Sequence, residues 1–345
     1  MQVTPWLFEF FHELRDPIAK EDPAAIQAHY RWYLDLWTQC EARGFEGIFY
    51  SEHHFGAGYS PSPNLVIAAM SQRTTTLRLG VIGTVSPYAT PWRVVEEFAM
   101  LDHLTGGRLE MGIVSGIPPE QGYVGITPAI GAERHAETLE VVAKALRDPV
   151  VTHHGTHWNF DDLRLVPRLL QRPPPVWTAT RTAASSSRAG ALGWKACGGF
   201  LSTADMAAAF DAYRAAASDA GHAHGPERLG IRRMISFVDD ERDQAAAVLA
   251  GKRHLVDVLS ASVGPLPPWA AVLDAPDGAT DVVSDDEFVG GTPTQVAEQL
   301  IEQCRATGAG NMCVTFGVIE PKELEVAHNT FAREVGPLLR KATVA

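Results

Sequence analysis

Polar residues directly follow each of three short apolar segments in the first third of the chain. Each apolar segment is rich in Ile, Val, Leu or Tyr, which indicates a buried strand. In parallel α/β folds, the carboxyl ends of the strands meet at the edge where ligands bind. The sequence therefore predicts that the chemistry is concentrated at one edge of a sheet. The strands and the polar segments after them are Gly47–Tyr50 with Ser51–His54, Leu77–Ile82 with Gly83–Pro87, and Leu109–Val114 with Ser115–Gly116.

The adjacent histidines His53 and His54 stand where the first of these strands ends. Neighbouring side chains of an extended segment point to opposite sides, so at most one of the two faces the ligand edge. That geometry disfavours a metal ion held by both, and we predict no metal site in the chain. A histidine has a pKa near neutrality, so it can exchange a proton with a bound reactant. The alternative is a structural histidine that is hydrogen-bonded beneath the loop.

A hydroxyl-rich turn, Arg181–Ser186, follows a later apolar segment at Val176–Ala179 and opens a helix. Free backbone N–H groups and hydroxyls at the start of a helix make a site for an anion such as a phosphate. Ordinary capping of the helix by Ser and Thr is the alternative interpretation of this turn. The turn is therefore a candidate site for the tail of a phosphorylated cofactor.

The elements that position these residues alternate between apolar strands and amphipathic helices along the whole chain. A spacing of roughly thirty residues per strand and helix is typical of a parallel α/β sheet or barrel. From eight strands we predict an α/β fold, a (β/α)8 TIM barrel that forms a single domain over residues 1–345. The pattern at Trp158–Val166 predicts an inserted surface hairpin, and Ser260–Gly291 is predicted to be a long mobile loop over the barrel mouth. The predicted strands are Val3–Phe11, Gly47–Tyr50, Leu77–Ile82, Leu109–Val114, Val176–Ala179, Ala196–Leu201, Leu229–Val238 and Asn311–Phe316.

The composition narrows the class of protein. The length of 345 residues fits one barrel with insertions, and 46% hydrophobic residues supply a large core. The chain carries 29 basic against 41 acidic residues, a net charge of −12, so no nucleic-acid partner is expected. No apolar run is long enough to cross a membrane and the N-terminus lacks a signal core, so a cytoplasmic protein is expected. The four cysteines have no paired spacing and are expected to be reduced.

With these motifs in place, the chain resembles the bacterial-luciferase-like family of flavin-dependent monooxygenases, including its luciferase α-subunit and limonene monooxygenase types. The order and spacing of the motifs together are specific, and the resemblance covers nearly the whole chain. The segments that carry it are Gly44-Phe45 with Ser51–Phe55, Pro61–Asn64 with Arg73-Thr74, Leu79-Gly80, Pro87 with Pro91, Glu96-Glu97 with Leu101-Asp102 and Gly107-Arg108, Gly112 with Gly116, Val289–Pro293, and Thr307–Asn311.

The resemblance implies a (β/α)8 barrel enzyme that binds reduced FMN at its carboxyl face. In the chemistry of this family, the flavin reacts with O2 to give a flavin C4a-peroxide, which then oxygenates a small organic substrate. The sequence shows no Gly-x-Gly-x-x-Gly nucleotide turn after an early strand, so we expect a separate flavin reductase to supply the reduced FMN. Two alternatives stay open: a deazaflavin-dependent hydride-transfer oxidoreductase and a non-catalytic flavin-binding subunit.

The resemblance also implies roles for individual polar residues. It places His53 at the position of the family's active-site histidine. It places His54 toward a subunit interface, and we expect a homodimer formed through the second and third strand–helix units. The family binds the FMN phosphate with hydroxyl residues that match Thr182 and Ser185, and with an arginine for which Arg134 is the candidate.

Three further positions match sites that the family places near the flavin or uses in luciferase chemistry. Ile82-Gly83 matches the place where the family holds a peptide bond, often cis, beneath the ring; an ordinary strand end with a glycine bulge fits the sequence equally well. Ser115 stands where luciferase has a basic residue near the flavin, which removes one expected phosphate partner. Val114 stands where luciferase has a reactive cysteine, which argues against luciferase itself.

Overall fold

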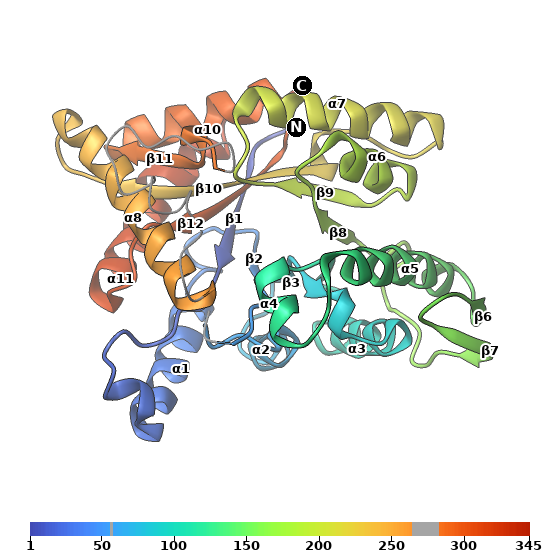
Figure 1. Cartoon of the computed structure of the whole chain (residues 1–345). Coiled ribbons are helices and arrows are strands. Elements are labelled where there is room, and N and C mark those ends of the chain that lie inside the picture. The colour runs from blue at the N-terminus through green and yellow to red at the C-terminus, as the bar shows by residue number, and fades with distance from the viewer. Residues whose placement is uncertain (56–57, 264–282) are drawn as a thin grey trace.

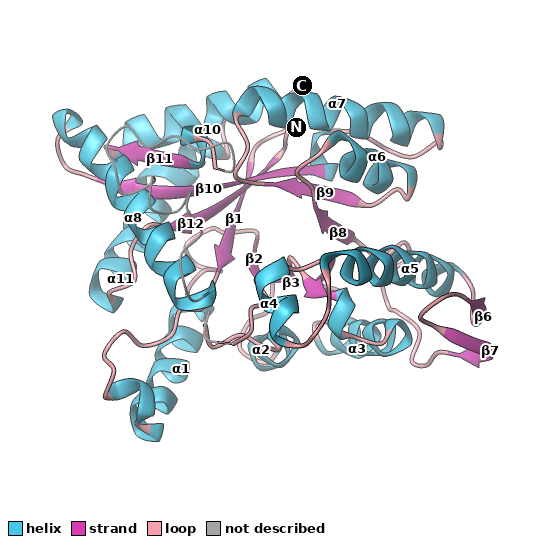
Figure 2. Ribbon diagram, viewed as in Figure 1, coloured by secondary structure: helices cyan, strands magenta, loops and turns pink. Residues whose placement is uncertain are grey.

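A computed structural model of the chain describes residues 1–55, 58–263 and 283–345. Eight parallel strands close into a barrel in the order β1-β2-β3-β5-β8-β9-β10-β12, and β12 pairs again with β1. Helices surround the strands, so the predicted (β/α)8 TIM barrel is confirmed (Figure 1, Figure 2). The barrel strands are β1 (Thr4–Glu9), β2 (Gly47–Tyr50), β3 (Arg78–Val81), β5 (Leu109–Val114), β8 (Val176–Ala179), β9 (Lys195–Gly198), β10 (Leu229–Phe237) and β12 (Asn311–Phe316).

Strand β10 is long enough to pair with two different strands on one side. Its residues Leu229–Ile231 pair with β9, and Met234–Phe237 pair with β11 (Phe288–Gly291). Strand β11 lies inside the segment predicted to be one long loop, and helix α8 (Gln244–Val263) covers its start. The first residues of the predicted loop Ser260–Gly291 therefore belong to α8, and its last four form β11. Residues 264–282, and with them most of the predicted lid, lie outside the described residues.

Helix starts follow local sequence signals. The side chain of Asp22 accepts a hydrogen bond from the backbone N–H of Ala24, and Thr292 and Gln295 form a capping box. Proline stands in the first turn of several helices, where no intrahelical hydrogen bond is lost. Within the described ranges, the α-helices besides α8 are α1 (Pro23–Thr38), α2 (Pro63–Ser71), α3 (Pro91–Leu104), α4 (Pro118–Tyr123), α5 (Pro128–Arg147), α6 (Ala183–Ala191), α7 (Thr203–Asp219), α10 (Pro293–Thr307), α11 (Pro321–Thr330) and α12 (Gly336–Leu339).

Large side chains fill the inside of the barrel. The ring of Trp6 stacks on Phe49 with centroids 4.7 Å apart, and Trp177 packs edge-on against Phe49 at 5.2 Å. A second, larger apolar cluster lies between the strands and the helices. Cys197 and Cys313 belong to the inner cluster. The four cysteines are buried and none forms a disulfide in the described ranges. The barrel is thus a packed scaffold, and its chemistry must lie at its ends.

The predicted surface hairpin is confirmed, although its first strand begins earlier than Trp158. Strands β6 (Val150–His154) and β7 (Asn159–Arg164) pair antiparallel beside α5, at the outer edge of the molecule (Figure 1). The termini lie close together, where the Met1 ammonium donates to the Val344 carbonyl at 2.7 Å. Of the helices in the described ranges, none is long and apolar enough to cross a membrane.

Candidate active site

His53 lies at the carboxyl edge of the barrel, just after β2 ends. Its ring atom Nδ1 is 2.9 Å from Oε1 of Glu120 on α4. The Glu120 side chain is 1% exposed, whereas that of His53 is 26% exposed. The second carboxylate oxygen of Glu120, Oε2, is buried without a hydrogen-bond partner among the described residues. A partly accessible imidazole is therefore joined to a buried carboxylate.

Glu120 is a residue of this site that sequence patterns do not reveal. It stands 67 positions from His53, and no motif links the two. The one available signal is its place in the segment after β5, which the parallel topology brings to the same edge as the end of β2.

The neighbouring His54 points to different partners. Its Nε2 lies 3.1 Å from Oε1 of Glu52, and its ring lies edge-on to Tyr88 at 5.1 Å. The hydrogen bond with Glu52 raises the pKa of His54, against the opposing effect of burial. The pKa of Tyr88 is raised to about 12 by burial and by the charges of Glu120 and Glu52. The two histidines thus have separate surroundings, as the extended backbone predicts.

Ile82 and Gly83 follow β3, and the peptide bond between them is cis. The backbones of β3 and β5 approach closely here. A Cβ added to Gly112 would lie 1.7 Å from the carbonyl oxygen of Val81, and one added to Gly83 would lie 2.9 Å from Val114 Cγ1. These positions therefore have no room for a side chain. The sequence fits a cis bond and an ordinary strand end equally well, and the structure has the cis bond.

The turn after β8 forms a complete cap on α6. The Thr182 hydroxyl accepts a hydrogen bond from the Ser185 N–H at 3.1 Å, and the Ser185 hydroxyl accepts from the Thr182 N–H at 3.2 Å. Thr182 is exposed and Ser185 is half-buried. Both hydroxyls therefore cap the helix and remain near its open N-terminus, so capping and anion binding are compatible here.

Arg134 and Ser115 both belong to the strand–helix unit that precedes this turn in the chain. Arg134 lies on α5 and donates from Nη1 to the Pro87 carbonyl at 3.2 Å, while its Nε is buried with no partner in the described part of the chain. Ser115 is exposed, and its carbonyl accepts a hydrogen bond from Gln121 Nε2 at 2.6 Å. Because β3, β5 and β8 are neighbours in the barrel, the segments that carry Ile82-Gly83, Ser115 and the turn share one edge.

Further buried polar atoms without hydrogen-bond partners gather at this edge. Within the described ranges they include Thr180 Oγ1 after β8, Arg232 Nη1 and Ser236 Oγ on β10, and His254 Nε2 on α8. Unpartnered polar atoms also occur in the core, at Tyr33 and His328, so those at this edge are atoms that a ligand or water is able to satisfy and do not define a site alone.

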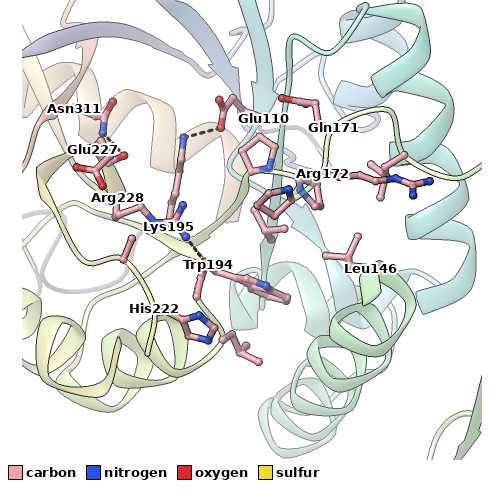
Figure 3. Close-up of a pocket in the computed structure, with 18 of the residues that line it drawn as sticks. Glu110, Leu146, Gln171, Arg172, Trp194, Lys195, His222, Glu227, Arg228 and Asn311 are labelled. Carbon is pink, nitrogen blue, oxygen red and sulfur yellow. Dashed lines mark hydrogen bonds and ion pairs between the residues drawn. The ribbon is translucent and has the colours of Figure 1, made fainter. Parts of the chain in front are cut away.

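The opposite end of the barrel carries a hollow of about 1070 Å³, lined by the amino ends of the strands (Figure 3). Its central carboxylate, Glu110, accepts hydrogen bonds from Arg78 and Trp177 at 2.5 Å each and from Lys195 at 3.2 Å. Burial lowers the pKa of Lys195. Of the described lining residues, Arg228 has a buried nitrogen without a partner. Glu110 thus pairs with Arg78 and Lys195 in this hollow, whereas the carboxyl edge carries the histidine–carboxylate pair, and we place the candidate active site there.

Comparison with known proteins identifies the family. Residues 17–310 match the luciferase-like monooxygenase family, so the chain belongs to it. The protein y4wF of Sinorhizobium fredii (strain NBRC 101917 / NGR234), which is uncharacterized, is 34% identical over 86% of this chain and 88% of its own. The FMNH2-dependent dimethylsulfone monooxygenase of Pseudomonas putida is 28% identical over 92% of this chain and 91% of its own. The oxygenase component of a flavin-dependent trigonelline monooxygenase from Acinetobacter baylyi (strain ATCC 33305 / BD413 / ADP1) is 30% identical over 43% of this chain and 42% of its own.

Solved structures share the fold. The monooxygenase RslO1 from Streptomyces bottropensis superposes with a TM-score of 0.80 at 23% identity, over 97% of this chain and 99% of its own. The oxygenating constituent of 3,6-diketocamphane monooxygenase of Pseudomonas putida, in complex with FMN, gives 0.75 at 18%, over 98% of both chains. An F420-dependent secondary alcohol dehydrogenase also gives 0.75, at 16%, over 99% of this chain and 100% of its own. The resemblance inferred from the sequence is confirmed, and the chain is an oxidoreductase of the flavin-dependent monooxygenase class.

Proposed function

We propose that the chain is the oxygenase component of a two-component monooxygenase that uses reduced FMN and O2 to oxygenate a small organic substrate. The observation that carries this proposal is the His53–Glu120 pair at the carboxyl edge of the barrel. A partly accessible imidazole held by a buried carboxylate is suited to proton transfer in such a reaction.

The residues at this edge fit a flavin with a phosphorylated tail. Ile82-Gly83 would lie against the ring, and Thr182 and Ser185, with the open N-terminus of α6, would hold the phosphate. The unpartnered Nε of Arg134 supports a place for that side chain near the phosphate. Ser115, which is exposed between these groups, would contact the cofactor through its hydroxyl. When bound, reduced flavin supplies the electrons that activate O2.

The pairing with Glu120 gives His53 a defined role. In this proposal, Nδ1–H of His53 donates a hydrogen bond to the Glu120 carboxylate. Nε2 is then the ring atom that exchanges a proton with the reactants. Glu120 thereby orients the ring. In this arrangement His53 is the catalytic residue and Glu120 is a positioning residue.

The choice of cofactor and partner rests on the relatives. One relative is named as FMNH2-dependent, and one structural neighbour contains FMN. Another relative is named as an oxygenase component, which supports a separate flavin reductase as partner. The F420-dependent neighbour shares the fold alone and keeps deazaflavin as the competing cofactor.

An anaerobic titration separates these cofactors. The purified protein is titrated with reduced FMN and, in parallel, with reduced F420, and the quenching of tryptophan fluorescence reports binding. The proposal predicts saturable binding of reduced FMN that is at least about tenfold tighter than that of F420. Tighter binding of F420 would identify a hydride-transfer enzyme instead. Tight binding of FMN without any later reaction with O2 and substrate would indicate a non-catalytic subunit.

A further inference from the structure

A buried arginine that the proposed proton transfer does not use stands at the same edge of the barrel. Arg232 lies on β10, opposite β3 in the closed order of strands, and is 5% exposed. Its guanidinium carbon is 4.4 Å from the ring centroid of Phe200, 5.5 Å from that of Phe8 and 5.8 Å from that of Phe10. Phe8 and Phe10 belong to the cluster inside the barrel. The charged group of Arg232 is therefore surrounded by aromatic rings rather than by water.

Arg232 and the adjacent Arg233 share one buried carboxylate. Nη2 of Arg232 lies 2.5 Å from Oε1 of Glu287, and Nη1 of Arg233 lies 3.6 Å from Oε2 of the same carboxylate. Both arginines and Glu287 are buried. Glu287 thus holds one terminal nitrogen of Arg232 and leaves Nη1 without a carboxylate partner in the described ranges.

The hydrogen bonds of Arg232 are also incomplete. Nη1 is buried and has no hydrogen-bond acceptor in the part of the chain that the structure describes, whereas Nη2 is held by Glu287. A guanidinium has five N–H donors, and buried donors without acceptors cost free energy. Gly199 leaves the space for this side chain, because a Cβ there would lie 3.0 Å from Arg232 Nε. A ligand that brings acceptor oxygens to Arg232 would complete these bonds.

We propose that Arg232 binds a carboxylate of the substrate, so that the substrates are small aromatic or aliphatic carboxylic acids. This proposal rests on the proposed function, because it takes the carboxyl edge as the site of oxygenation. A guanidinium matches a planar carboxylate through two parallel N–H···O bonds, and the phenylalanine rings match an apolar body. Because β10 faces β3 across the barrel, a carboxylate at Arg232 directs the body of the substrate toward Ile82-Gly83.

The phosphate of the cofactor is the competing ligand for Arg232. The turn at Thr182–Ser185 already offers backbone and hydroxyl donors on β8, two strands along the barrel from β10. A phosphate dianion also loses more hydration free energy than a carboxylate on entering a site walled by Phe8 and Phe200. The surroundings of Arg232 therefore favour the carboxylic acid.

Binding of matched acids and amides to the whole protein tests this proposal without requiring turnover. Isothermal titration is carried out with benzoate against benzamide, and with hexanoate against hexanamide, with and without reduced FMN under anaerobic conditions. The variants are Arg232→Met, which removes the charge, and Arg232→Lys, which keeps it but loses the forked geometry. Arg31→Met, at an exposed position on α1, is the control. Circular dichroism verifies folding, and Arg232→Lys decides the question if Arg232→Met does not fold.

The expected result is that the wild type binds at least one acid about tenfold or more tightly than its amide. Arg232→Met should lose this preference, Arg232→Lys should retain part of it, and Arg31→Met should retain all of it. Unchanged acid binding in Arg232→Met, or no preference for either acid in the wild type, overturns the proposal. A loss of affinity for reduced FMN in Arg232→Met, with acid binding intact, assigns Arg232 to the cofactor and also overturns it. Failure of the proposed function is seen separately, as failure of the wild type to bind reduced FMN.

Discussion

At the scale of single residues, the proposed chemistry depends on the pair formed by His53 and Glu120. We propose that His53 exchanges a proton through Nε2 while Glu120 holds its Nδ1. His54 has a similar arrangement with Glu52, at 3.1 Å, but faces Tyr88. The chain therefore contains its own matched control, a second histidine–carboxylate pair that we place outside the chemistry.

Replacing His53 with Ala should lower turnover about 10²–10⁴-fold, the usual contribution of a general acid or base, and leave flavin affinity nearly intact. Glu120→Gln should lower turnover by less, about tenfold, because the ring stays in place but loses its anionic partner. Both are measured with reduced FMN supplied in excess. Glu52→Gln, which alters the partner of His54, should leave turnover close to that of the wild type. Equal turnover by His53→Ala would remove His53 from the mechanism.

The polar partners of the site are the part that the sequence does not predict. His53 could be placed because it directly follows a strand and belongs to a recognisable segment. Glu120 and Arg232 stand in segments without a motif, and their proposed roles rest on contacts between segments distant in the sequence, such as the ion pair of Arg232 with Glu287. No local pattern records which side chains meet after the barrel closes.

At the scale of elements, the junction between β3 and β5 should tolerate little change. A Cβ at Gly83 would lie 2.9 Å from Val114 Cγ1 and 3.0 Å from the backbone of Gly112 and Ile113. Gly83→Ala must therefore move β5, at a cost of about 1–3 kcal/mol. Flavin affinity should fall about tenfold or more, since the surface at Ile82-Gly83 moves with it.

Gly122 provides the matched control for this substitution. It lies on the neighbouring α4, and nothing stands within 4 Å of an added Cβ. Gly122→Ala should leave the flavin titration unchanged and should not lower the thermal midpoint, because Ala fits a helix better than Gly. A Gly83→Ala protein that matches Gly122→Ala in both measurements would show that this junction does not shape the cofactor site.

Elements with strong local signals were predicted well, and those held by distant pairing were not. Caps and prolines mark the starts of α1 and α10, and continuous apolar runs mark the eight barrel strands. The sequence predicts a loop where β11 lies, because Phe288–Gly291 ends in two glycines and is too short to show the alternation of a strand. It forms because the second half of β10 extends beyond β9 and offers it a partner.

At the scale of the whole molecule, the surface of α3 bears on the expected homodimer. Phe98 is fully buried and Trp92 is half-buried, so both pack within the core of the single chain. Met100 is 55% exposed, and Leu65 of the adjacent α2 is 72% exposed. We expect Met100→Glu to give a folded monomer, because a two-fold interface repeats each unfavourable contact. Light scattering with circular dichroism measures this. A wild type that is already monomeric at micromolar concentration would exclude the dimer.

Buried histidines should make the fold sensitive to acid. Burial lowers the pKa of His135 and His254 to about 4 and that of His328 to about 3. Below about pH 6.5 the unfolded chain therefore binds more protons than the folded one, so stability is complete above that pH and is lost as the pH falls. We expect the free energy of unfolding in urea to fall by a few kcal/mol from about pH 7 to about pH 5.

A paired substitution assigns this pH dependence to burial. His328→Gln should reduce its slope by up to about 1.4 kcal/mol per pH unit, the effect of one proton, whatever its effect on stability itself. His224→Gln, at an exposed loop position, should leave the slope unchanged. Equal slopes in both variants would contradict the assignment.

The central claim is that the carboxyl edge of this barrel binds reduced FMN and controls its reaction with O2. Rapid mixing of the anaerobic complex of protein and reduced FMN with aerated buffer tests this claim without knowledge of the substrate. We expect the flavin absorbance to return with a time course distinct from that of free reduced FMN. We also expect this time course to change in His53→Ala at saturating protein. A time course identical to that of free reduced FMN, with the wild type in saturating excess, would contradict the account.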